Sequence, residues 1–102
     1  MNAYLAVFDD TRLTRNQFVE AINRVSAVED WLSFMPSAAC LISPLSATEL
    51  TGAIQAQNAN IRLMITQIDL ANMNGRLERE VWEFIHKPRT APRERQLARQ
   101  LA

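Results

Sequence analysis

The chain has little cysteine or glycine and no long apolar run, and each of these scarcities excludes a class of protein. One cysteine among 102 residues excludes an internal disulfide and a zinc site made of several cysteines. Two glycines are too few for a glycine-rich phosphate-binding loop. The longest apolar run, residues 3–8, is far shorter than the ~20 residues that a membrane-spanning helix needs. We therefore expect a cytoplasmic protein that does not enter membranes.

The composition is otherwise typical of a folded globular protein, with 48% hydrophobic and 22% charged residues. The net charge of zero hides an asymmetry along the chain. Residues 1–86 carry six arginines against ten acidic side chains, whereas residues 87–102 carry five basic side chains against one acidic. An acidic body followed by a basic segment predicts a domain over residues 1–87 and a basic C-terminal tail over residues 88–102.

Residues 4–8 predict a first strand, because they are rich in aromatic and branched side chains that suit a sheet. Apolar side chains fall on both faces of this strand, a pattern typical of a central strand that is covered on both sides. Thr14 and Gln17 have the spacing of a capping box, and apolar side chains recur after them at helical intervals. The sequence therefore predicts a helix that begins at Arg15.

The middle of the chain predicts a hairpin followed by a second helix. Residues 31–34 predict a short edge strand, Pro36 a turn, and residues 38–43 the longer second strand of the hairpin. Ser46 and Glu49 then have the spacing of a second capping box. We expect the second helix to begin directly after Ser46.

The last part of the domain predicts one more strand and one more helix. Apolar and polar side chains alternate over residues 61–66, and apolar side chains have helical spacing over residues 76–86, before Pro88. This order of elements predicts an α+β fold, a ferredoxin-like βαββαβ sandwich with an extra C-terminal helix. We expect four antiparallel strands, with the helices that begin at Arg15 and Ala47 on one face.

Three segments resemble a small ferredoxin-fold family that includes SinR-like proteins, VapD-like toxins and the small subunit of the CRISPR spacer-acquisition complex. Residues 3–9 resemble the family's opening strand, which closes with an aromatic residue and aspartate. Trp31 with residues 39–43 resembles the SinR-like hairpin, and residues 45–50 resemble the entry to its second helix. The resemblance covers about residues 3–86 and implies a fold and a homodimer more than an activity.

Asp9 is the one metal ligand that the resemblance implies. In nuclease-like relatives the aspartate at the end of this strand faces its twin across a dimer and holds a divalent metal. Oxygen ligands of this kind suit Mg²⁺. The residues alone favour a simpler interpretation, in which Asp9 and Asp10 form the turn that ends the strand. We therefore expect no cofactor, and keep a divalent metal at Asp9 as the alternative.

We expect structural roles for the other side chains that could take part in catalysis or binding. Cys40 lies between apolar neighbours in a strand and should behave as a small hydrophobe. His86, the single histidine, ends a helix, where a side chain that can carry positive charge complements the dipole. Trp31 and Trp82 are expected in a core or a dimer interface rather than as platforms for nucleic-acid bases, because basic residues are not interleaved with them.

The basic tail is the remaining candidate binding segment. Arginine clusters of this kind bind nucleic acids or acidic protein partners. We expect the tail to pack two leucines against the protein or its dimer mate, and keep a nucleic-acid-binding arm as the alternative. Its four arginines are Arg89, Arg93, Arg95 and Arg99.

Without a catalytic constellation, the sequence favours a small homodimer that acts as a structural, assembly or regulatory interaction module and is not an enzyme. Two alternatives stay open. One is a metal-dependent nuclease or ribonuclease that uses Asp9 across a dimer interface. The other is a nucleic-acid-binding module that uses the basic tail.

Overall fold

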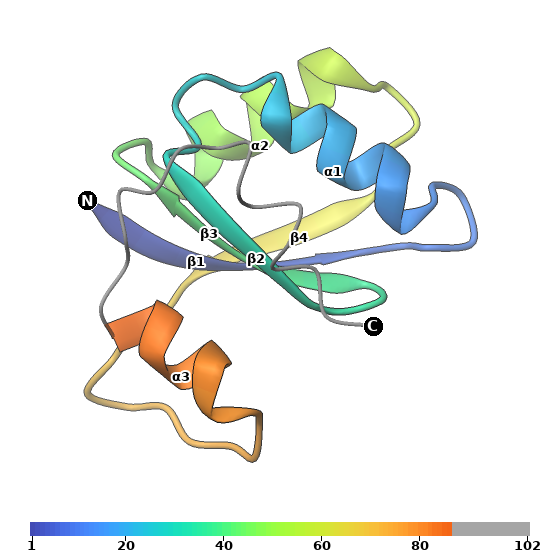
Figure 1. Ribbon diagram of the computed structural model, residues 1–102. Helices are drawn as coiled ribbons and strands as arrows, with labels where there is room; N and C mark the ends of the chain where they lie inside the picture. The colour runs from blue at the N-terminus through green and yellow to red at the C-terminus, as the bar shows by residue number, and fades with distance from the viewer. Residues whose placement is uncertain (87–102) are drawn as a thin grey trace.

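The computed structural model describes residues 1–86, which form an α+β fold, as predicted. A single antiparallel sheet has four strands in the order β2-β3-β1-β4 (Figure 1). The basic tail, including Arg89, Arg93, Arg95 and Arg99, lies outside the described residues. The elements are β1 (Asn2–Phe8), α1 (Arg15–Asn23), β2 (Asp30–Met35), β3 (Ala38–Ser43), α2 (Ala47–Gln57), β4 (Leu63–Gln67) and α3 (Arg79–His86).

Both predicted capping boxes are present and set the start of their helices. The Thr14 hydroxyl accepts the Gln17 N–H at 3.1 Å, and Gln17 Oε1 accepts the Thr14 N–H at 2.9 Å. Ser46 and Glu49 make the same reciprocal pair at 3.2 and 3.0 Å. These bonds satisfy backbone donors that a helix N-terminus leaves without partners. As a result α1 and α2 begin at the predicted residues.

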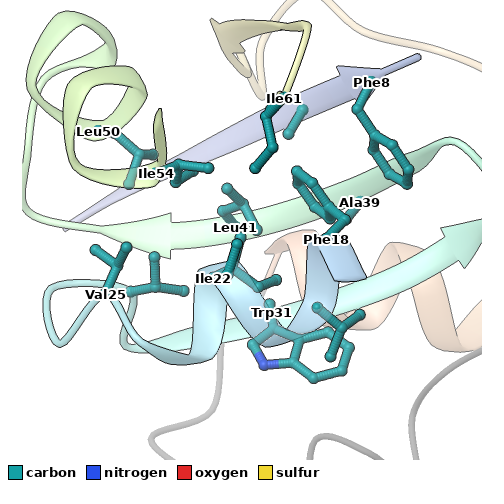
Figure 2. Packing of buried hydrophobic residues seen from close by; sticks show 14 of the residues in the cluster. Phe8, Phe18, Ile22, Val25, Trp31, Ala39, Leu41, Leu50, Ile54 and Ile61 are labelled. Carbon is teal, nitrogen blue, oxygen red and sulfur yellow. The ribbon is translucent and has the colours of Figure 1, made fainter. Parts of the chain in front are cut away.

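Helices α1 and α2 lie together on one face of the sheet and cover the larger core (Figure 1). The side chains of alternate β1 residues, Tyr4, Ala6 and Phe8, are buried against this layer. The Phe8 and Phe18 rings stack with centroids 4.1 Å apart, and the fully buried Trp31 closes one side of the cluster (Figure 2). The strand pattern that predicts burial on this face is therefore confirmed.

Helix α3 lies on the opposite face of the sheet, where it forms a second, smaller core. Val81, Phe84 and Ile85 pack against Leu32, Cys40 and Ile42 of the hairpin strands, and all six side chains are buried. This contact covers part of the second apolar face that the sequence predicts. In the part of the chain that the structure describes, no helix is long and apolar enough to cross a membrane.

Two boundaries differ from the prediction because apolar spacing reports packing rather than backbone conformation. Leu77 fits the helical spacing and packs in the smaller core, but it does so from the loop before α3. Ile61 fits the alternation of the last strand, yet it is buried in the larger core from a turn that its N–H closes with Asn58 O at 3.3 Å. Strand β4 begins two residues later, at Leu63.

Candidate functional site

An apolar row open to solvent crosses the end of the sheet that α3 does not cover. Met35 pairs with Ala38, Ala38 with Val7, and Val7 with Met64, so the row crosses all four strands. Residues paired in this way point to the same face. The side chain of Ala38 is buried, whereas Met35, Val7 and Met64 are 46%, 39% and 64% exposed. Apolar side chains that gather on a surface in this way are typical of contact sites.

The two edge strands of the sheet differ in how their outer backbone groups are used. On β2, the buried Asp30 carboxylate accepts the Trp31 N–H at 2.9 Å. The Arg15 guanidinium donates to the Ser33 carbonyl at 2.5 Å and to the Ser33 hydroxyl at 2.7 Å. Side chains of this chain therefore occupy two backbone groups of this edge strand, the Trp31 N–H and the Ser33 carbonyl, that could otherwise pair with a further strand.

Among residues 1–86, the outer backbone groups of β4 have no such partners. The Asp9 N–H donates to Arg62 O at 2.9 Å, and the Ile68 N–H donates to Ala3 O at 2.8 Å. Because hydrogen bonding alternates along an antiparallel pair, the backbone N–H and C=O groups of the even-numbered residues, Met64 and Thr66, point toward β1. The N–H and C=O groups of Leu63, Ile65 and Gln67 therefore face outward. Within residues 1–86, no hydrogen bond engages those groups.

Asp9 forms the turn that the residue pattern favours. Its Oδ1 accepts the Thr11 N–H at 3.0 Å and the Thr11 hydroxyl at 2.5 Å, and its Oδ2 lies 3.8 Å from Arg12 Nε. The Thr11 hydroxyl, then the Thr11 N–H and the positive charge of Arg12, lower the pKa of Asp9. Asp10 is exposed beside it. Among the described residues, no group of three acidic, histidine or cysteine side chains gathers as potential metal ligands.

The other candidate residues form no common site, and among those in the described residues only Trp82 and His86 are in ring contact. Burial raises the pKa of the Cys40 thiol to about 12, so the thiol stays protonated at neutral pH and lacks the thiolate a nucleophile needs. Trp31 is fully buried and donates its indole N–H to Asn23 Oδ1 at 2.9 Å. Trp82 is half-buried on α3, with its ring centroid 6.4 Å from that of His86. None of these residues lies in the apolar row.

No family model, curated protein or solved structure matches this chain. The site therefore has to be judged on its own geometry. Sequence reasoning missed both the apolar row and the open β4 edge. One signal was available, because the alternation over residues 61–66 already places Met64 on the side away from the larger core.

Proposed function

We propose that this chain is a small homodimeric interaction module, cytoplasmic, that serves a structural, assembly or regulatory role and carries no chemistry of its own. The observation that carries the proposal is the apolar row Met35–Ala38–Val7–Met64, which crosses all four strands and ends at Met64 on an open edge. Covering these side chains removes apolar surface from water, which is the main favourable term in protein association.

The strand order supports a ferredoxin-like sandwich as the framework of this module. A βαββαβ succession whose sheet has the order β2-β3-β1-β4, with both connecting helices on one face, is compatible with that fold. Helix α3 is then the extra C-terminal helix. The resemblance to SinR-like and VapD-like proteins is part of the same proposal and rests on the sequence segments alone.

A structural role rather than catalysis is supported by how the reactive side chains are used. The Asp9 carboxylate accepts two hydrogen bonds from Thr11 in its own turn, and the Cys40 thiol is buried and protonated. Trp31 packs in the larger core. Each of these residues therefore has a structural use that accounts for its position.

Sedimentation equilibrium of the full chain over a range of concentrations tests the proposal. We expect a dimer that the double substitution Val7→Thr with Met64→Thr weakens, because threonine keeps strand propensity but removes apolar surface. Leu70→Thr is the matched control, since Leu70 is 47% exposed on a loop outside the row. A chain that stays monomeric at high micromolar concentration contradicts the proposal.

The metal-dependent nuclease remains the second candidate because Asp9 is an ionised, partly exposed carboxylate at the end of β1. Mg²⁺- or Mn²⁺-dependent cleavage of RNA or DNA that is lost in Asp9→Ala would favour it. The nucleic-acid-binding alternative concerns Arg89, Arg93, Arg95 and Arg99, outside the described residues. Binding that weakens steeply with salt and is lost on truncation after Lys87 would favour that alternative.

A further inference from the structure

We propose that the dimer forms by strand addition at β4, which pairs antiparallel with β4 of a second copy, with Ile65 opposite Ile65 of the partner subunit. The inference rests on the proposed homodimer and specifies its contact at the Met64 end of the apolar row; Met35, on the opposite edge strand, is not part of this contact. The result would be one continuous sheet that spans both copies. The proposal rests on an uncharged edge strand that lies beside the exposed end of the apolar row and whose outward backbone groups make no hydrogen bond within residues 1–86.

The backbone groups select this register. Leu63, Ile65 and Gln67 carry the outward N–H and C=O groups, and Ile65 lies midway between the other two. With Ile65 on the twofold axis, Leu63 of each copy lies opposite Gln67 of the other. All three outward residues of each strand then belong to hydrogen-bonded pairs, and each such pair exchanges two bonds. A shift of register leaves part of this set without a partner.

The side chains are compatible with the same register. Strand β4 contains no charged residue and no proline, the two features that commonly protect an edge strand from pairing. Met64 would lie opposite Thr66 of the other copy, which leaves the two Met64 side chains as diagonal neighbours at about 7–8 Å. The most exposed member of the apolar row would thus gain apolar contacts from its twin.

Charge favours a second copy over a strand of unrelated sequence. Arg62 precedes β4 and Asp69 follows it closely, and both side chains are exposed. Antiparallel self-pairing brings Arg62 of each copy beside the Ile68 and Asp69 end of the other, so opposite charges meet at both ends. The β2 edge is a poorer site, because Asp30 and Arg15 already occupy the Trp31 N–H and the Ser33 carbonyl.

Cysteine cross-linking tests the register. In Ile65→Cys the two introduced thiols would face each other across the twofold axis, with Cα atoms about 5.5 Å apart, a separation that a disulfide can span. In Gln67→Cys the two thiols would be offset by four residues, about 13 Å along the strands, and cannot join. We expect mild oxidation to give a covalent dimer for Ile65→Cys only. The native Cys40 is buried, so the unsubstituted chain should not cross-link.

Proline at the edge tests the hydrogen bonds separately. Gln67→Pro removes an outward N–H without removing a bond to β1, so we expect the dimer to weaken by about tenfold while the monomer stays folded. Gln67→Thr keeps the N–H and should leave the dimer unchanged. If a dimer persists while Gln67→Pro has no effect and Ile65→Cys gives no cross-link, strand addition is wrong but the homodimer stands. If no dimer forms at any concentration, both proposals are wrong.

Discussion

The two edge strands of the sheet differ in how much of each is buried by the rest of the chain. The first four residues of β2, at one edge, are buried, with Trp31 and Leu32 fully so. Strand β4, at the other edge, has no fully buried residue, and its Met64 is 64% exposed. Both strands pair with only one neighbour, so their position in the sheet does not explain the difference.

The difference comes from what each edge receives from neighbouring elements. Helix α1 places Arg15 over the edge of β2, where it donates to Ser33, and Asn23 of the same helix accepts the indole N–H of Trp31. Beyond β4 no described element supplies side chains to the outer backbone groups. An edge left in this state is a template for a further strand. Among residues 1–86, β4 is therefore the edge whose outward backbone groups stay without a partner, which is why the proposed strand addition is placed there.

The largest expected effect of substitution is at Trp31. Trp31→Ala should lower the free energy of unfolding by about 3–5 kcal/mol, because it empties a fully buried site in the larger core. Met64→Ala, on the other edge, should change the stability of the monomer by no more than about 0.5 kcal/mol. Urea denaturation at low protein concentration measures both values. Similar losses in the free energy of unfolding for the two substitutions would contradict the difference between the edges.

A smaller effect is expected when the β2 edge loses its arginine. Arg15→Met keeps an apolar stem but leaves the Ser33 carbonyl and hydroxyl without the guanidinium, at a cost of about 1–3 kcal/mol. Arg12→Met is the matched control, since Arg12 is exposed and lies 3.8 Å from the Asp9 carboxylate. Its ion pair should contribute about 0–1 kcal/mol. Thermal unfolding of the two variants at pH 7 distinguishes these outcomes.

The N-caps of the two helices test whether α1 stabilises the β2 edge. Thr14→Ala and Ser46→Ala should each cost about 1 kcal/mol, because each removes the N-cap of a helix with a complete capping box. Only Thr14 adjoins Arg15, however, so only Thr14→Ala should also speed hydrogen exchange of the β2 amides. Equal exchange rates on β2 in both variants would show that α1 does not secure this edge.

The smallest effect is the pH dependence contributed by Asp9. Its pKa in the folded protein is lowered below the ordinary value of 3.8 by hydrogen bonds from Thr11, so the unfolded chain takes up a proton at higher pH than the folded chain. The resulting stabilisation is present above pH 3.8 and is lost as the pH falls through the lowered pKa. Wild type and Asp9→Asn should differ slightly in melting temperature near pH 6 and converge as the pH falls through the lowered pKa of Asp9. A difference in melting temperature that grows as the pH falls would contradict this prediction.

The sequence predicted well those features that depend on local chemistry. The capping boxes at Thr14 and Ser46 fixed the starts of two helices, because the side-chain and backbone partners lie within three residues of each other. The hairpin and the edge position of β2 were also predicted and are confirmed. These signals need no knowledge of distant contacts.

Features that depend on distant segments escaped prediction. Val7, Ala38 and Met64 become neighbours only when β1, β3 and β4 pair, so no local pattern indicates that they form one row. The contact of Arg15 with Ser33 likewise joins residues 18 positions apart. Whether an apolar face is covered depends on where α3 lies, which its own spacing does not specify.

Hydrogen exchange of the β4 amides, followed by NMR at increasing protein concentration, tests the central claim most directly. The amides of Met64 and Thr66 face β1 and should be protected at every concentration. The amides of Leu63, Ile65 and Gln67 should exchange quickly in the monomer and become protected as the dimer forms. The Trp31 amide, bound by Asp30, serves as an internal reference that should not change. Dimerisation that leaves Leu63, Ile65 and Gln67 unprotected would contradict strand addition at β4.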